Sequence, residues 1–239
     1  MSVNKVEIEG ILQSSNQAFL ESRSYSIGKR VSLMRAVADE IEALGPELIE
    51  AAMAESNLPE GRLIGEKGRT IFQWRSYADA VERGDSLQAS IDTANPDRTP
   101  PKPDLRKTNI PIGPVAVFGA SNFPFAFSTA GGDTASAFAA GCTVVVKAHP
   151  GHPKTSTIMA DAISRAVEKL GMPKGMFSHV LSSSYEAGQM IVSHPVIKAV
   201  GFTGSLRGGM ALVELGNKRP DPIPVFAEMG SINPVFFMP

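Results

Sequence analysis

Apolar residues in the first third of the chain recur at helical spacing. Between residues 27 and 44, starting at Val31, they recur every three or four positions with charged residues mostly between them, which predicts an amphipathic helix. The Gly-Pro pair that follows ends this helix, and a proline near the first turn begins a second one over residues 46–56. A third helical pattern covers about 66–83. We therefore expect the first third to be helical.

A proline-rich segment comes next. Residues 86–112 contain five prolines and two short alternating pieces, at 87–92 and 105–110. Proline is excluded from central strands, so these pieces predict an exposed hairpin or edge strands that reach toward a partner subunit. A plain linker is the alternative.

From residue 113 onward, short apolar runs alternate with helical patterns. The expected strands are 115–118, 143–147, 177–181, 197–202 and 224–229. The expected helices are 127–140, 153–170, 185–192 and 206–215. Strands that are apolar throughout and alternate with helices indicate an α/β fold with a parallel sheet covered on both faces. In such sheets ligands bind beyond the carboxyl ends of the strands, so function should be sought there.

The first of these strands ends in "GASN", which allows two interpretations. It is a near miss for the nucleophile elbow Gly-x-Ser-x-Gly, with Ser121 as the attacking group but Phe123 where the second glycine should stand. It is equally a strand-to-loop turn that receives a nucleotide, with Asn122 as its polar side chain. The residues alone leave both open.

Three other strand ends carry polar groups with two interpretations each. Lys147 either reaches solvent or binds a ribose or phosphate. Gly204 and Ser205 form either an ordinary turn with Ser205 as helix N-cap or a pyrophosphate site at a helix N-terminus. Glu228 is either a solvated strand-end residue or a general base whose pKa rises through desolvation.

Common nucleotide and metal motifs are absent from the sequence. It contains neither Gly-x-Gly-x-x-Gly nor Gly-x-x-x-x-Gly-Lys-Ser/Thr, so a bound nucleotide requires a variant turn. His149 and His152 lack an acidic or sulfur partner nearby, which argues against a metal site. Cys142, the single cysteine, stands where a helix turns into a strand and is expected to be a small buried hydrophobe.

Composition and charge narrow the partners and the compartment. The 239 residues are 43% hydrophobic and 20% charged with a net charge of -1, which is typical of a globular chain and gives no reason to expect nucleic acid. No run approaches the roughly 20 apolar residues that span a bilayer, and we expect neither a signal peptide nor a membrane partner. One cysteine excludes an internal disulfide and favours a reducing compartment, so we expect a cytoplasmic protein that binds small molecules.

Taken together, three segments resemble the aldehyde dehydrogenase superfamily. They are "PIGPVAVFGASNFPFAFSTAGGDTASAFAAGCTVVVKAHPGHPKTS", "VGFTGS" and "AEMGSINPV". With "ESNLPEGRLIGEKGRT" they are similar, more narrowly, to the NADP-utilising 2,5-dioxopentanoate (alpha-ketoglutarate semialdehyde) dehydrogenases. The likeness spans nearly the whole chain.

The resemblance implies a Rossmann-like NAD(P)-binding fold and a role for each strand end. In that family a cysteine thiolate attacks an aldehyde, and the product is a carboxylate. By motif match, Asn122 would stabilise the oxyanion and Glu228 would activate the water or the thiol. The residues that would line the cofactor are Phe118, Gly119, Ala120, Ser121, Lys147, His149, Pro150, Gly204, Ser205, Met229 and Gly230.

One departure bears on the cofactor. NAD-preferring relatives commonly carry a glutamate three residues after the lysine, and here that position is Pro150. Without that carboxylate a 2'-phosphate meets no repulsion, so we expect NADP to be preferred, with NAD possible as a second cofactor.

The same resemblance predicts how the chain is organised. Residues 1–85 would be N-terminal helices of the cofactor-binding domain, 86–112 bridging strands that form part of an oligomerisation hairpin, and 113–239 the Rossmann-like domain. The family's nucleophilic cysteine lies downstream of the glutamate, and no cysteine follows Cys142 here. We therefore expect an N-terminal portion that is inactive alone and belongs to a homo-oligomeric enzyme. Alternatives are a dehydrogenase for another aldehyde, such as a fatty or succinic semialdehyde, and a non-catalytic nucleotide-binding remnant.

Overall fold

The computed structural model describes residues 4–231 and 233–238. Its α-helices are α1 (Lys5–Ser22), α2 (Ile27–Glu42), α3 (Pro46–Ser56), α4 (Glu60–Glu82), α5 (Gly132–Ala139), α6 (Pro153–Lys169), α7 (Tyr185–Ser193) and α8 (Leu206–Asn217), with two 3-10 turns, η1 (Asp85–Leu87) and η2 (Lys174–Met176). Its strands are β1 (Ser90–Asp92), β2 (Leu105–Lys107), β3 (Val115–Phe118), β4 (Val144–Lys147), β5 (Phe177–Val180), β6 (Ala199–Thr203) and β7 (Val225–Glu228). In these ranges none of the helices is long and apolar enough to cross a membrane.

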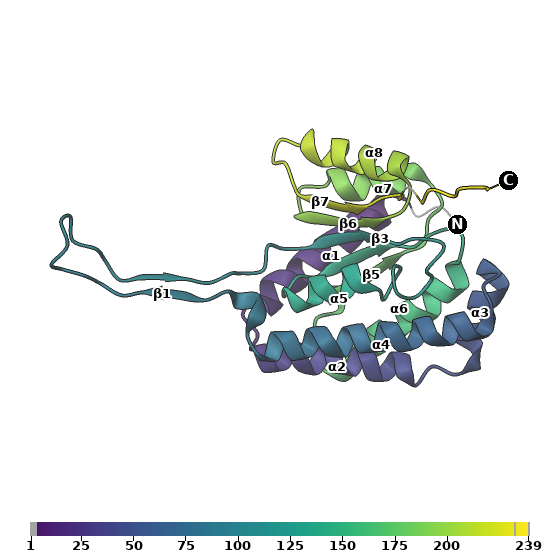
Figure 1. The fold of residues 1–239 in the computed structure, drawn as a ribbon, viewed down its shortest axis with the longest axis horizontal. Helices are drawn as coiled ribbons and strands as arrows, with labels where there is room; N and C mark the ends of the chain where they lie inside the picture. Colours follow the sequence, from purple (N-terminus) through teal and green to yellow (C-terminus); the bar gives the residue numbers. More distant parts are fainter. Residues whose placement is uncertain (1–3, 232, 239) are drawn as a thin grey trace.

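A parallel sheet in the order β5-β4-β3-β6-β7 forms the centre of the fold (Figure 1). The register places Phe118 opposite both Lys147 of β4 and Phe202 of β6, and it places Thr203 opposite Glu228 of β7. Each of these residues stands at or near the carboxyl end of its strand. The predicted α/β class and all five predicted strands are thus confirmed.

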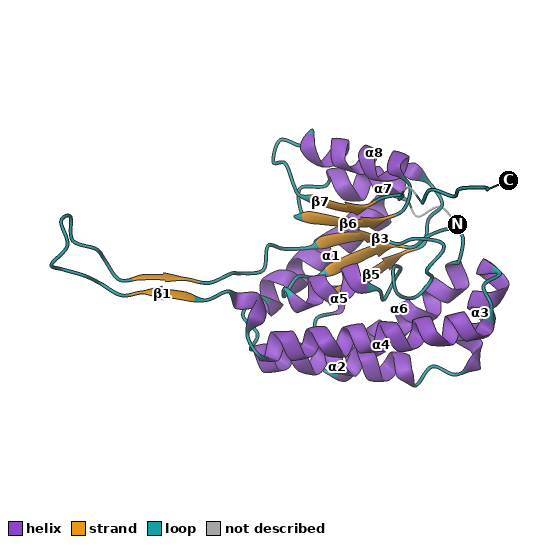
Figure 2. Cartoon of the chain, viewed as in Figure 1, coloured by secondary structure: helices purple, strands orange, loops and turns teal. Residues whose placement is uncertain are grey.

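The two faces of the sheet are covered by different helices (Figure 2). Alternate residues of β3 belong to different cores: Val117 to the core formed with residues of α2 to α6, and Ala116 to the core formed with residues of α1, α7 and α8. Because a strand's side chains alternate between faces, a run that is apolar at every position is the expected pattern for a strand covered on both sides. The result is a three-layer arrangement.

Helix α1 was not predicted as a separate element. Its N-terminus carries a capping box, in which Asn4 and Glu7 each accept a backbone hydrogen bond from the other residue. Its buried face includes Ser15, which is fully buried and donates to Thr143 Oγ1 over 2.9 Å. Serine on a buried face weakens the apolar periodicity, and this explains why the sequence pattern missed the helix.

Two predicted helix starts were wrong. α5 was expected from residue 127 but begins at Gly132, because residues 121–131 form turns held by contacts with α4. α4 was expected from about residue 66 but begins at Glu60. In both cases the residue that begins the observed helix follows a proline or glycine and lies among polar positions, where periodicity is uninformative.

The proline-rich segment forms an antiparallel two-stranded arm. β1 pairs with β2, with Ile91 opposite Arg106, and an isolated bridge joins Asn95 to Lys102 farther along. Figure 1 shows this arm projecting far from the body of the molecule. The hairpin interpretation is confirmed over the plain linker.

Candidate functional site

The carboxyl ends of β3, β4, β6 and β7 lie along one edge of the sheet and bring the predicted site residues together. Because the strands are parallel and Phe118 is in register with both Lys147 and Phe202, the segments that follow these strands leave the sheet side by side. Glu228 joins them through β7, and its carbonyl accepts a 3.0 Å hydrogen bond from the backbone N–H of Gly204. This edge is where an α/β sheet binds ligands.

The turn after β3 approaches its own downstream loop very closely. A Cβ on Gly119 would lie 2.5 Å from the Cα atom of Ser128, so this position tolerates only glycine. The N–H of Ala120 donates to the carbonyl of Phe127 over 2.8 Å. Ser121 and Asn122 are left exposed at the tip of the turn. In the described part of the chain no side-chain hydrogen bond joins Ser121 to a histidine, so the nucleophile-elbow interpretation lacks a base.

Helix α4 holds the loop that carries Asn122, a role that the sequence analysis missed. Arg62 donates to the carbonyl of Asn122 over 2.8 Å. Glu66, which is 6% exposed, accepts from the backbone N–H groups of Phe125 and Ala126 over 2.8 and 2.9 Å. Trp74 donates from Nε1 to the carbonyl of Ala130 over 2.8 Å. The only sequence signal was a glutamate on the buried face of a helix, where an unpaired charge is costly.

His152 fixes the backbone at the start of the same turn. Its side chain is 1% exposed, and Nε2 donates to the carbonyl of Ala120 over 2.8 Å. His149 lies beside it, with ring centroids 5.5 Å apart, and its pKa is lowered by burial and then by the charges of His152 and Lys147. Among residues 4–231 and 233–238 no group of three metal-binding side chains includes this pair. His152 therefore orders the turn after β3, and His149 orders its own loop by accepting from the backbone N–H of Gly151 over 3.0 Å.

Lys147 is held at the end of β4 by a specific contact. Its ammonium donates to the carbonyl of Ser182 over 2.8 Å, and the side chain is half-buried. Burial lowers the pKa of this lysine. Gly188 packs closely beside it, because a Cβ there would lie 3.2 Å from the ring of Phe118 and 3.6 Å from Lys147 Cδ. Lys147 is thus half-buried, with its ammonium at the carbonyl of Ser182.

The turn between β6 and α8 contains a capped helix N-terminus. Ser205 Oγ accepts from the backbone N–H of Gly208 over 3.2 Å, so the N-cap interpretation is confirmed. A Cβ on Gly209 would lie 2.6 Å from both Cγ and Sδ of Met229, and this close approach seats Met229 against α8. Gly230 stands exposed just beyond it.

Of the two alternatives for Glu228, the structure shows the solvated strand-end position and not a desolvated carboxylate. Its side chain is exposed, because β7 is an edge strand with alternating half-buried and exposed positions. The half-buried carboxyl nearby is Asp133 in the first turn of α5, whose pKa is raised by burial and further by the charge of Glu228. Asp133 packs over Gly201 of β6. Sequence reasoning missed it, although "GGD" before a helix was a usable signal.

Cys142 has the surroundings of a structural cysteine. It is 2% exposed, and burial raises the pKa of its thiol. A thiol kept protonated and out of solvent is a poor nucleophile. The expectation of a small buried hydrophobe is confirmed.

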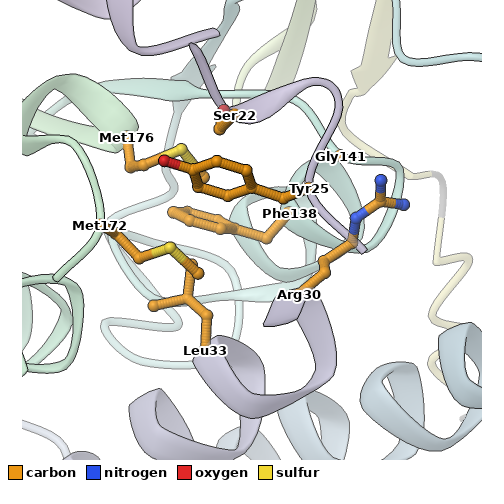
Figure 3. A pocket seen from close by; sticks show the side chains of 8 residues that line it. All are labelled: Ser22, Tyr25, Arg30, Leu33, Phe138, Gly141, Met172 and Met176. Carbon is orange, nitrogen blue, oxygen red and sulfur yellow. The ribbon is translucent and has the colours of Figure 1, made fainter. Parts of the chain in front are cut away.

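A small cavity opens at the other edge of the sheet (Figure 3). It has a volume of about 20 Å³ and is lined by Ser22, Tyr25, Arg30, Leu33, Phe138, Gly141, Met172 and Met176. Gly141 and Met176 come just before β4 and β5, so the cavity lies at the amino ends of the strands. Figure 3 shows rings and sulfur atoms gathered there, with the guanidinium of Arg30 extending away from them. The space fits about one water and is too small for a nucleotide.

Comparison with known proteins identifies this arrangement. A profile described as the aldehyde dehydrogenase family matches residues 1–239. The chain belongs to the aldehyde dehydrogenase family. Among curated members, it is 53% identical over 236 residues to alpha-ketoglutaric semialdehyde dehydrogenase 2 of Azospirillum brasilense and 51% identical over 234 residues to alpha-ketoglutaric semialdehyde dehydrogenase of Acinetobacter baylyi. Each match covers 98% of this chain but only 45% and 44% of those enzymes. The resemblance seen in the sequence is confirmed.

Solved structures share the fold of this aldehyde dehydrogenase chain. Glyceraldehyde-3-phosphate dehydrogenase GapN from Methanocaldococcus jannaschii, complexed with NADP, superimposes with a TM-score of 0.83 at 19% identity, over 98% of this chain and 48% of its own. An NAD-dependent benzaldehyde dehydrogenase from Corynebacterium glutamicum gives a TM-score of 0.80 at 23% identity, over 96% of this chain and 47% of its own. The family fold therefore persists where the sequences have diverged.

Proposed function

We propose that these residues form the cofactor-binding part of an NADP-dependent aldehyde dehydrogenase that oxidises alpha-ketoglutaric semialdehyde to 2-oxoglutarate. One arrangement carries this proposal: Lys147 and Glu228 end two strands of one parallel sheet, and Asn122 comes shortly after a third strand, at the same edge. The 53% identity to an alpha-ketoglutaric semialdehyde dehydrogenase supports the choice of substrate. Activity, substrate and partners are assigned to the whole enzyme of which these residues form part.

The residues at this edge fit a dinucleotide with an extra phosphate. The N-terminal turn of α8 is exposed at Ser205 and contains no acidic side chain, so its N–H groups and dipole favour a pyrophosphate. Lys147 supplies a cation at the end of β4, and residues 148–152 contain no carboxylate to repel a 2'-phosphate. The cofactor would contact residues 118–121, Lys147, His149, Pro150, Gly204, Ser205, Met229 and Gly230. NAD is the second cofactor to test.

Asn122 and Glu228 have complementary tasks in this reaction. The exposed side-chain amide of Asn122 would donate to the aldehyde oxygen as negative charge develops on it. The exposed carboxylate of Glu228 would accept a proton from the attacking water or thiol. When bound, the nicotinamide cofactor accepts the electrons that the aldehyde carbon loses. We assign no nucleophile within residues 1–239, because Cys142 is buried and burial raises its thiol pKa.

The β1–β2 arm supports a homo-oligomer. A two-stranded hairpin is marginally stable by itself, and this one exposes Ile91 to 69% and Leu105 to 53%. A second copy of the chain that packs against the arm would bury these side chains. A cytoplasmic location stays a prediction.

Cofactor binding by the 239-residue chain tests the proposal. In calorimetric titrations we expect saturable binding of NADP that is at least about tenfold tighter than that of NAD. Lys147→Met should weaken NADP binding, because it removes the cation at the carboxyl end of β4. Lys174→Met is the matched control, since Lys174 is exposed in the turn before β5, at the opposite edge of the sheet. Tighter binding of NAD, or no binding of either nucleotide, contradicts the assignment.

A further inference from the structure

Two arginines of α4 stack on the aromatic residues next to Asn122. The Cζ atom of Arg62 lies 4.7 Å from the ring centroid of Phe123, and that of Arg69 lies 4.9 Å from the ring centroid of Phe127. The two rings meet edge to face with centroids 5.3 Å apart. Residues seven apart share a helix face, so both guanidinium groups lie along the same side of the loop. The row Arg62–Phe123–Phe127–Arg69 runs away from Asn122.

These two arginines differ in charge pairing from the arginines between α4 and α2. Arg75 of α4 is paired with Asp39 and Glu42, and Arg35 of α2 is paired with two acids of α4. Within residues 4–231 and 233–238, neither Arg62 nor Arg69 takes part in an ion pair. The charged side chains of α4 that face α2 are therefore paired, whereas in the described residues the two arginines that face the Asn122 loop are not.

The acid closest in sequence does not neutralise them. Glu66 stands between the two arginines on the helix, but its carboxylate is buried against the backbone N–H groups of Phe125 and Ala126. Both guanidinium groups remain exposed. One N–H group of the Arg62 guanidinium donates to the carbonyl of Asn122. Packing against the ring of Phe123 orients the remaining N–H groups of the planar guanidinium. A guanidinium group that is oriented and has no acidic partner is suited to bidentate binding of a carboxylate.

We propose that Arg62 and Arg69 bind the carboxylate of an anionic aldehyde, with the aldehyde group at Asn122. The inference rests on the proposed function, since alpha-ketoglutaric semialdehyde carries a carboxylate at the end remote from its aldehyde. Arg62 stands beside the residue that would hold the aldehyde oxygen, and the guanidinium N–H groups that do not bond the Asn122 carbonyl are free to meet the carboxylate. Arg69 adds a second cation where the row opens into a hollow lined by Arg69, Phe72, Gln73, Ser76 and Tyr77. The arginines thus select charged over neutral aldehydes of the same length.

The test compares an acid with its methyl ester, which lacks this charge and carries one added methyl group. 2-Oxopentanoate has the five-carbon skeleton and the remote carboxylate of the proposed substrate, and its methyl ester is neutral. Calorimetric titration of the 239-residue chain with saturating NADP should give saturable binding of 2-oxopentanoate, about tenfold tighter than that of the ester. Arg62→Gln should weaken binding of the acid about tenfold and binding of the ester by a clearly smaller factor, because only the acid loses a charge partner while both lose the anchor of the Asn122 carbonyl. Arg62→Lys should lose less affinity for the acid, because lysine retains the positive charge but cannot form the two parallel hydrogen bonds of a guanidinium.

Matched variants separate this inference from the proposed function. Arg69→Gln should weaken binding of the acid by a smaller factor, and Arg98→Gln, in the turn of the hairpin arm, should have no effect. All four variants should keep the NADP affinity of the unsubstituted chain. Equal binding of acid and ester, no binding of the acid, or equal effects of the Arg62 and Arg98 changes overturns the carboxylate site. Loss of NADP binding by the unsubstituted chain overturns the proposed function instead.

Discussion

Oε1 of Glu66 lies 2.8 Å from the backbone nitrogen of Phe125, so an acidic side chain of α4 is buried against the main chain of the loop after β3. The same oxygen accepts from Ala126. The other oxygen, Oε2, is buried without a partner in the described residues. A carboxylate in such surroundings is stable only because these hydrogen bonds compensate for lost hydration. Glu66 therefore couples the loop that presents Asn122 to the core.

Glu66→Ala should destabilise the chain by about 2–4 kcal/mol, because it leaves two buried N–H groups without an acceptor. Urea unfolding followed by circular dichroism measures this loss. Glu66→Gln retains an acceptor oxygen and should cost less. Glu50→Ala, at an exposed glutamate of α3, is the control and should change stability by less than about 0.5 kcal/mol. Equal effects at positions 66 and 50 would mean that the loop does not depend on this anchor.

The sequence predicted the sheet well because β3, β4 and β6 are apolar at almost every position, and burial on both faces leaves that pattern no other stable arrangement. It also predicted which strand ends would meet, since parallel strands share an edge. It could not reveal that α4 holds the Asn122 loop, because the partners of Glu66 and Trp74 are backbone atoms about sixty residues away that have no side-chain signature. The roles of the site residues and the three-part domain division stay predictions.

His179 should make stability depend on pH. Its Nε2 is hydrogen-bonded to Ser156 Oγ over 2.8 Å, and burial lowers the pKa of this histidine to about 4. The unfolded chain takes up the proton near pH 6.5 but the folded chain only near pH 4, so stability is complete above pH 6.5 and falls as the pH is lowered through this window. The loss should reach about 3 kcal/mol at pH 4.

Urea unfolding of the chain and of His179→Gln between pH 7 and pH 4 checks this dependence. The variant should show a flatter profile, because glutamine takes up no proton. His194→Gln is the control, since His194 pairs with Glu9 near the surface. Parallel profiles for the chain and the His179 variant would exclude His179 as the source.

Pro150→Glu should reverse the cofactor preference. The substitution adds a carboxylate three residues after Lys147, at an exposed position beyond β4. A negative charge there should repel a 2'-phosphate and accept hydrogen bonds from the hydroxyls of an unphosphorylated ribose. We expect NADP affinity to fall about tenfold or more and NAD affinity to rise.

Titrations of both nucleotides into Pro150→Glu and Pro150→Gln distinguish charge from shape. Glutamine removes the proline ring without adding charge, so it should preserve most of the NADP preference. If both substitutions lower NADP affinity equally, the loss comes from the backbone of the turn and not from repulsion.

Ile91→Asp should disrupt assembly of the chain into oligomers. Ile91 is 69% exposed on an arm that projects from the body, and its strand pairs only with β2 in the described residues. A charge that must be buried in a contact between two copies costs several kcal/mol, whereas on a solvated arm it costs almost nothing. Light scattering should give a multiple of 25.3 kDa for the unsubstituted chain and a lower mass for the variant. Thr93→Asp adds the same charge just beyond β1 and should have a smaller effect, so equal masses for all three proteins would show that the arm does not mediate assembly.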